Sequence, residues 1–423
     1  MASYADCLAA LPAFRNDLLR SQSLEGPTAA AMASPLAFTT RGAFAAFATP
    51  LTNVHATGVG IRQRNGRYDP AENVIKVFVF DKVEGEAPGV PKVFGPNNIP
   101  VDVEYLPVQV VRASGKKSGK GGAKGGAKKG RAGRKARAEK VAAASDAQVN
   151  AAAAGVAAVG SSVEVGAVGP QALEPQRDHR RPVVGGISIS PLRANFVGTL
   201  GCFLLRRNVD TEEVFALSNN HVLANVDRLP VGTSIVQPGP EVPPFLTDEQ
   251  NAFAILHTII PIQFPTASAE PVFNRFDAAI ANVINGQLIE RGSIFGMARA
   301  DQPNPNNLPV YDPSRVVSPE PRMRVMKMGR TTGFTRGIIT ATNVQGVQVN
   351  YGTVAFPRIA VYRGVLTIVG DDNKPFSLPG DSGSVILEEA TGNPVALLFA
   401  GDGVTTTACD LGALCQQLGA WPV

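Results

Sequence analysis

Short β-type runs separated by glycine and proline recur at close spacing from Val183 to the end of the chain. This pattern is typical of an all-β barrel or sandwich. Six of these runs begin at Gly198, Glu213, Asp277, Gly337, Ile359 and Ser384. The chain holds 43 Gly and 33 Pro among its 423 residues, which favours many turns over a helical bundle. We therefore expect a mainly β fold, with residues 183–423 long enough for one pair of β-barrels.

The first 113 residues predict a small α+β domain. Leu8, Leu11, Phe14, Leu18 and Leu19 are spaced as one face of a short amphipathic helix. Three β-type runs follow, and they begin at Gly58, Ile75 and Val101.

Residues 114–182 differ from both flanking regions in composition. They are first Lys/Gly/Ala-rich and then Ala/Val/Gly-rich, and they contain no aromatic residue. Such a segment buries too little apolar surface to offset its chain entropy, so we expect a disordered, flexible linker. Residues 116–140 carry eleven Lys or Arg and one acid, which leaves the rest of the chain at −5 although the total is +5. Two interpretations stay open for this segment, non-specific nucleic-acid binding and a solvated, self-repelling spacer.

The strongest chemical signal is the run Leu378-Pro-Gly-Asp-Ser-Gly-Ser384. A serine between glycines on a tight turn is typical of an exposed nucleophile, and the glycine before it lets backbone N–H groups point at one spot. The same residue types also make ordinary turns. The motif therefore predicts Ser382 as a nucleophile, provided that a base lies nearby.

Two other residues are candidates for the partners of this serine. A serine nucleophile needs a base, and the base needs a third group to orient it. Of the four histidines, only His221 both belongs to the β-rich region and directly follows a β run. Asp277 leads into an apolar run, so it is expected to be partly buried and to need a hydrogen-bond partner. The alternative for Asp277 is a carboxylate that caps a turn.

The order His221, Asp277, Ser382 with Gly-Asp-Ser-Gly around the serine resembles the trypsin-like, chymotrypsin-fold serine peptidases. The likeness is greatest to a bacterial subgroup without secretion signals and with an N-terminal extension. Further segments that resemble this subgroup begin at Asn53, Ile99, Gly185, Gly198, Leu217, Phe276, Lys327 and Ala396.

The resemblance implies a chymotrypsin-like double β-barrel and a role for each site residue. Ser382 is expected to be the nucleophile, His221 the general base and Asp277 the group that orients it. The backbone N–H groups of Gly380 and Ser382 are the expected oxyanion donors. The substrate pocket is assigned to Phe376, Ala400 and Gly401. A phenylalanine at the base of the pocket implies a small or apolar P1 residue, and Asp402 is the one acid that could reverse this.

Four scattered cysteines are too few for a disulfide framework in so long a chain. Cys202 matches one half-cystine of secreted relatives, but Val222 stands where its partner is expected. With no signal peptide and no long apolar run, the sequence predicts a cytoplasmic protein that does not enter the membrane. Pro182 after Arg181 argues against a zymogen cleavage there. Without an N-terminal amine freed by such a cleavage, the role of Asp381 stays open. No metal or cofactor is expected, and the oligomeric state is not predicted.

The leading hypothesis is a serine endopeptidase of protein or peptide substrates, regulated by its N-terminal region. One alternative is a catalytically silent binding module with a protease fold. Another is a protein tethered to nucleic acid through residues 116–140. We also expect self-cleavage between residues 141 and 170, because tethering brings this Ala/Val-rich stretch to mM effective concentration.

Overall fold

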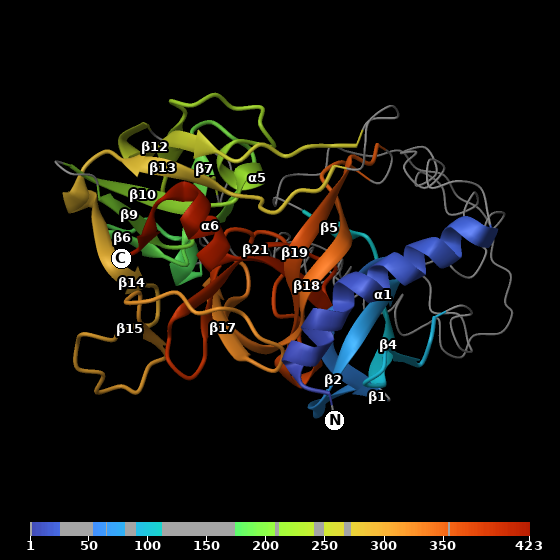
Figure 1. Cartoon of the computed structure of the whole chain (residues 1–423). Helices are drawn as coiled ribbons and strands as arrows, with labels where there is room; N and C mark the ends of the chain where they lie inside the picture. The colour runs from blue at the N-terminus through green and yellow to red at the C-terminus, as the bar shows by residue number, and fades with distance from the viewer. Residues whose placement is uncertain are drawn as a thin grey trace, which may run out of the picture.

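The computed structural model describes residues 2–25, 54–64, 66–80, 90–111, 174–207, 211–240, 249–265, 272–353 and 356–423. Most strands belong to two sheets, one of eleven strands and one of eight, which lie side by side in Figure 1. The prediction of a mainly β fold is confirmed. Residues 112–173 lie outside the described residues, and they include most of the expected linker (114–182) with its basic segment and the expected self-cleavage stretch.

Six strands of the larger sheet form a closed antiparallel barrel. They are β17 (Arg324–Gly329), β18 (Gly333–Asn350), β19 (Ile359–Gly370), β20 (Val385–Glu388), β21 (Pro394–Gly401) and β22 (Thr405–Asp410). They pair in the order β17-β20-β21-β22-β19-β18, and β18 pairs back with β17. Closure gives each of these six strands a neighbour on both sides, but β18 and β21 extend beyond this paired part and also pair with strands from the N-terminal region. Ile339, Ile368 and Phe376 are buried in the core of this barrel.

The eight-stranded sheet surrounds a second core, which includes Phe203, Ala216 and Phe253. Its strands are β7 (Ser188–Pro191), β8 (Gly198–Thr199), β9 (Phe203–Arg207), β10 (Glu212–Ser218), β11 (Ser234–Val236), β12 (Ala252–Ile259), β13 (Ala279–Val283) and β23 (Trp421–Pro422). Strand β23 pairs with β9, so the end of the chain returns to this sheet after α6 (Leu411–Leu418). A third apolar cluster joins both sheets, since it contains Leu217 from one and Leu397 from the other.

Two small parallel pairs complete the region after residue 182. β6 (Val183–Gly185) pairs with β14 (Ile289–Ile294), and β15 (Ala298–Arg299) pairs with β16 (Val310–Tyr311). Single-turn helices lie at Pro175–Arg177, Asn220–Leu223 (α5), Glu249–Asn251, Gly286–Leu288 and Asp371–Asn373.

The N-terminal residues form α1 (Tyr4–Glu25), β1 (Val54–Arg64), β2 (Arg67–Val79), β3 (Val93–Phe94), β4 (Ile99–Tyr105) and β5 (Gln109–Val110). Strand β1 pairs with both β2 and β18, so this sheet is continuous with the barrel. Helix α1 lies across it (Figure 1).

The buried face of α1 differs from the predicted one. It consists of Cys7, Leu11, Phe14 and Leu18, whereas Leu8 is 38% exposed. Cys7 and Leu11 are four residues apart and Leu11 and Phe14 three, which places them on one face of the helix. Leu11, Phe14 and Leu18 lie on the buried face as predicted, and Cys7 takes the place expected for Leu8 because a free cysteine packs as a small hydrophobe.

The division into domains of residues 1–113, 114–182 and 183–423 stays a prediction. The expectation of a flexible linker is wrong for residues 174–182, because they make specific contacts with the folded region, such as the 2.9 Å hydrogen bond from Arg181 to the Asn251 carbonyl. Gln176 is buried there, and Arg177 Nε donates to the Arg330 carbonyl at 2.9 Å. None of the described helices is long and apolar enough to cross a membrane.

Candidate active site

Strand pairing brings His221 and Asp277 together. Ser218 at the end of β10 pairs with Ala279 at the start of β13. His221 lies just after the first strand end and Asp277 just before the second. Their side chains meet with 2.6 Å between His221 Nδ1 and Asp277 Oδ2, and the His221 backbone N–H donates to Asp277 Oδ1 at 3.2 Å. Asp277 is fully buried and His221 is 4% exposed. A buried carboxylate held in this way fixes the orientation of the imidazole.

Two tyrosines from the β18–β19 hairpin support Asp277 from the other sheet. The Tyr351 hydroxyl donates to Asp277 Oδ2 at 2.8 Å and also hydrogen-bonds the Tyr362 hydroxyl. Burial, together with the charge of Asp277, raises the pKa of Tyr351 well above its usual value. Tyr351 therefore keeps its proton and remains a donor. Neither tyrosine was predicted, because they meet Asp277 only through the packing of one sheet on the other.

The Ser382 turn is built from two glycines with positive φ. Gly380 has φ +101° and Gly383 has φ +95°. A Cβ on Gly380 would lie 2.4 Å from Thr331 Oγ1, and one on Gly383 would lie 2.1 Å from Ser218 Oγ. Both glycines are therefore required by backbone conformation and by close contact.

The same turn is docked against the eight-stranded sheet. The Thr199 N–H donates to the Ser382 carbonyl and the Thr199 hydroxyl donates to the Gly380 carbonyl, both at 2.9 Å. The Ser218 hydroxyl in turn donates to the Thr199 carbonyl at 2.7 Å. Ser218 leads directly into the segment that carries His221, so the docking places the Ser382 turn beside that segment.

The hydrogen bond expected between Ser382 and His221 is not formed. Among the described residues, His221 Nε2 is buried and has no hydrogen-bond partner. The Ser382 residue is 6% exposed. Hydrogen bonds of this kind are often long in a free enzyme and shorten when substrate binds. The catalytic roles of His221, Asp277 and Ser382 stay a prediction.

Asp381 is fully buried and fully hydrogen-bonded. Its Oδ1 accepts from the backbone N–H of Thr331 and Thr332, at 2.8 and 3.1 Å. Its Oδ2 accepts from the Leu378 N–H at 2.9 Å and the Thr332 hydroxyl at 2.7 Å. Lys327 Nζ, also fully buried, lies 3.5 Å from Oδ2. Lys327 therefore supplies the counter-charge that the sequence left open for Asp381.

The predicted oxyanion donors are available. Among the described residues, neither the Gly380 N–H nor the Ser382 N–H donates a hydrogen bond. An amide pair left free on a docked turn can bind an oxygen that carries developing negative charge.

The three residues assigned to the substrate pocket have different surroundings. Phe376 is 1% exposed and belongs to the barrel core. Ala400 and Gly401 lie at the end of β21, and the ideal Cβ position of Gly401 is 3.5 Å from Ser377 Oγ. Asp402 accepts from the Val404 and Thr405 N–H groups, at 2.8 and 2.7 Å. The pocket assignment stays a prediction.

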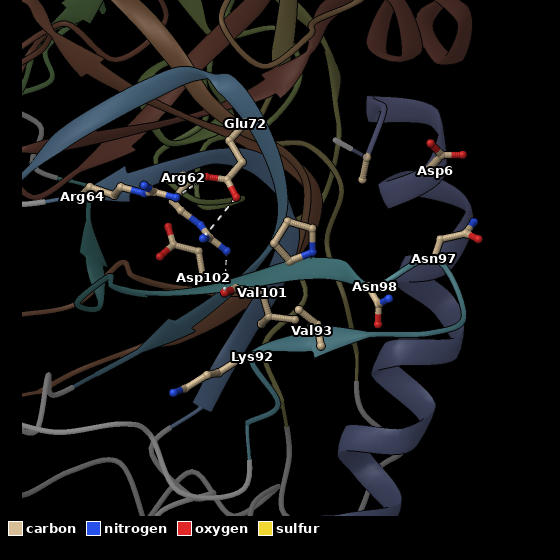
Figure 2. Close-up of a pocket in the computed structure, with 12 residues that line it drawn as sticks. Asp6, Arg62, Arg64, Glu72, Lys92, Val93, Asn97, Asn98, Val101 and Asp102 are labelled. Atoms are coloured by element: carbon tan, nitrogen blue, oxygen red, sulfur yellow. Dashed lines mark hydrogen bonds and ion pairs between the residues drawn. The ribbon is translucent and has the colours of Figure 1, made fainter.

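The other histidines lie away from this site. His55 stacks on Phe80 in the N-terminal region, His179 is exposed before β6, and His257 on β12 packs against Phe215 of β10. A pocket of about 810 Å³ also belongs to the N-terminal residues (Figure 2). Arg62 and Arg64 reach into it, but Glu72 pairs with both, at 3.1 and 2.8 Å. Among the described residues, no group of His, Cys, Asp and Glu side chains could hold a metal ion.

No protein-family model matches the chain, and no curated protein matches it. Solved structures do. A chymotrypsin from Cellulomonas bogoriensis is 15% identical, with a TM-score of 0.36 over 57% of this chain and 98% of its own. Thermobifida fusca protease A and a Nocardiopsis protease are each 14% identical, with TM-scores of 0.35 over 57% of this chain and 98% of theirs.

All three matches concern the fold alone. The closed six-stranded barrel, the second sheet and the docking between them confirm the predicted chymotrypsin-like class. Membership of one subgroup stays a prediction.

Proposed function

We propose that the protein is a serine endopeptidase that uses Ser382, His221 and Asp277. The observation that carries this proposal is the buried His221–Asp277 pair, whose free Nε2 lies on the segment against which the Ser382 turn docks. An ordinary turn serine would need neither an oriented imidazole nor two unused amide donors.

The reaction follows from the roles of these groups. The Ser382 hydroxyl attacks the peptide carbonyl while His221 Nε2 takes its proton, and Asp277 stabilises the resulting imidazolium through Nδ1. The Gly380 and Ser382 N–H groups bind the oxyanion of the tetrahedral intermediate. His221 then gives its proton to the leaving amine, which leaves an acyl group on Ser382. Water, activated by His221, hydrolyses this ester and restores the serine.

The finer predictions of the sequence belong to the same proposal. Substrates are proteins or peptides with a small or apolar P1 residue, and the N-terminal region regulates access to them. The enzyme acts in the cytoplasm. Cleavage of a peptide library mainly after Lys or Arg would contradict the predicted P1 preference.

A fluorophosphonate probe tests the proposal because it forms a covalent adduct only with an activated serine. We expect intact-mass analysis to show one adduct on the wild type and none on Ser382→Ala. Ser318→Ala is the matched control, since Ser318 is exposed on the same half of the chain and should label as the wild type does. Folded protein that does not label under any activating condition would favour the alternative, a catalytically silent binding module.

A further inference from the structure

Strand β5 brings the N-terminal region to the end of β21. Val110 pairs antiparallel with Gly401, and Gln109 and Val110 also pair in parallel with Val349 and Asn350 of β18. β5 therefore lies between the ends of two barrel strands that do not pair with each other (Figure 1).

The pairing at Gly401 identifies which edge of β21 is covered. On one side of β21, Leu398 pairs with Ala408 and Gly401 pairs with Thr406, both of β22. On the other side, the Leu398 N–H donates to the Ser384 carbonyl at 3.0 Å, and the Gly383 N–H donates to the Leu398 carbonyl at 2.9 Å. A strand residue has only one neighbour on each side within a sheet. Val110 must therefore lie on the second side, on the edge that also carries the Ser382 turn.

Side-chain contacts hold β5 in this position. Gln109 is fully buried, and its Nε2 donates to Asp402 Oδ2 at 3.2 Å. Its Oε1 accepts from the Thr407 hydroxyl at 3.3 Å. Upstream of β5, the Leu106 carbonyl lies 2.8 Å from His55 Nε2. A buried amide with partners for both its oxygen and its nitrogen is a specific contact.

We propose that Gln109 and Val110 occupy the edge of β21 on which a peptide substrate is bound, so that the N-terminal region blocks substrate until β5 leaves. The inference rests on the proposed peptidase function. Extended peptides bind proteins by adding a strand to an open sheet edge, where main-chain hydrogen bonds give affinity and side-chain pockets give specificity. A peptide that follows β21 to Ser382 needs the edge that β5 covers. The subsite beside Asp402 and Thr407 then accepts a neutral amide side chain, as it accepts Gln109.

Strand β5 is short enough to be displaced from the edge of β21. Two paired residues contribute few hydrogen bonds, each worth about 1 kcal/mol net. Tethering offsets the small number of hydrogen bonds. Residues 106–108 join β5 to β4, and a segment held this close to its site has an effective concentration in the mM range. A free peptide therefore competes poorly with β5 in the wild type and well once β5 is weakened.

Peptide binding to the full chain tests the proposal. The probe is a fluorescent peptide that copies residues 106–111, Leu-Pro-Val-Gln-Val-Val, and every protein carries Ser382→Ala so that no cleavage occurs. Val110→Pro removes an N–H from β5, and Gln109→Ala removes the contacts with Asp402 and Thr407. We expect each to bind the peptide about tenfold more tightly than Ser382→Ala alone, which corresponds to loss of one hydrogen bond from β5.

Gln345→Ala is the matched control, because Gln345 is exposed on β18 and pairs with Thr57 and Arg363 instead of β5. We expect it to leave binding unchanged, and a peptide of the same composition in scrambled order should not bind. Equal binding by all variants, or no binding by any, would overturn the proposal. Gln109→Ala keeps the test decisive if Val110→Pro does not fold.

A second measurement separates this inference from the proposed function. With Ser382 restored, fluorophosphonate labelling reports whether the serine is activated. Tighter peptide binding by both variants without labelling of any protein would leave β5 as an occluding strand and contradict the peptidase. Labelling of Ser382 with unchanged peptide binding would support the peptidase and contradict the role of β5.

Discussion

Lys327 Nζ lies 3.5 Å from Asp381 Oδ2, and both side chains are fully buried. The pair joins β17 to the turn that carries Ser382. Burial lowers the pKa of Lys327, and the charge and hydrogen bond of Asp381 oppose that shift. Lys327 Nζ also donates to the Thr332 hydroxyl at 2.6 Å. Lys327 thus supplies a counter-charge to Asp381 from within the barrel and helps to hold the turn that carries Ser382.

Lys327→Met should destabilise the fold by about 3–5 kcal/mol, because it leaves the buried Asp381 carboxylate without a counter-charge. Labelling of Ser382 should fall with it. Lys327→Met combined with Asp381→Asn should recover part of the loss, since no charge is then buried alone. Urea unfolding of the two single variants and the double variant measures the coupling. Additive losses would show that the two side chains do not interact.

Gly380→Ala should lower kcat/KM at least about 100-fold, which is the usual effect of losing one oxyanion donor. The new Cβ would lie 2.4 Å from Thr331 Oγ1, so the turn must shift its N–H groups. Gly364→Ala is the matched control, because Gly364 has φ +69° but nothing within 4 Å of its Cβ position. Gly364→Ala should lower the free energy of unfolding by about 1–2 kcal/mol through backbone strain and leave kcat/KM unchanged.

Tyr351→Phe should lower kcat about 10- to 100-fold with little change in KM. It removes one hydrogen bond to the Asp277 carboxylate, and such bonds to charged groups contribute about 1.5–3 kcal/mol. Steady-state kinetics on a peptide substrate provide the measurement. Tyr4→Phe is the control, since the one hydrogen bond that its hydroxyl makes among the described residues is with Thr342 of β18. A change in KM alone would place Tyr351 in substrate binding instead.

His55 should make the fold less stable in acid. Burial lowers its pKa to about 4 from the usual 6.5, with backbone hydrogen bonds to Leu106 and Gly346 acting in the opposite direction. Between these two values the unfolded chain binds a proton that the folded chain does not, so the free energy of unfolding falls as the pH drops from 6.5 to 4. The loss should reach about 1–3 kcal/mol.

Urea unfolding of the wild type and of His55→Gln at pH 7 and pH 4.5 checks this expectation, because glutamine does not titrate. Between pH 7 and pH 4.5, the free energy of unfolding of the wild type should fall by more than that of His55→Gln. An equal fall in both proteins would show that the pKa of His55 is the same in the folded and the unfolded chain.

Much of the candidate site follows from local patterns in the sequence. The glycines around Ser382 predict a tight turn, and the β runs before His221 and after Asp277 place both at strand ends. Each of these signals lies within a few residues of the side chain that it concerns. Periodicity and turn chemistry act over that range, which is why the mainly β class and the three catalytic candidates could be selected without a structure.

Only the tertiary structure decided which distant groups complete the site. Tyr351 meets Asp277 because two sheets pack together, and Lys327 meets Asp381 because the barrel closes on itself. Val110 meets Gly401 across almost 300 residues of chain, in a pairing that no local pattern indicates. Such contacts depend on the register of strands far apart in sequence and on the burial of charge between them. Backbone hydrogen bonds at a strand edge depend little on the side chains of the partner strand, so the sequence of one strand does not identify its partner. The strand register and the buried charge pairs are therefore set only when the whole chain packs.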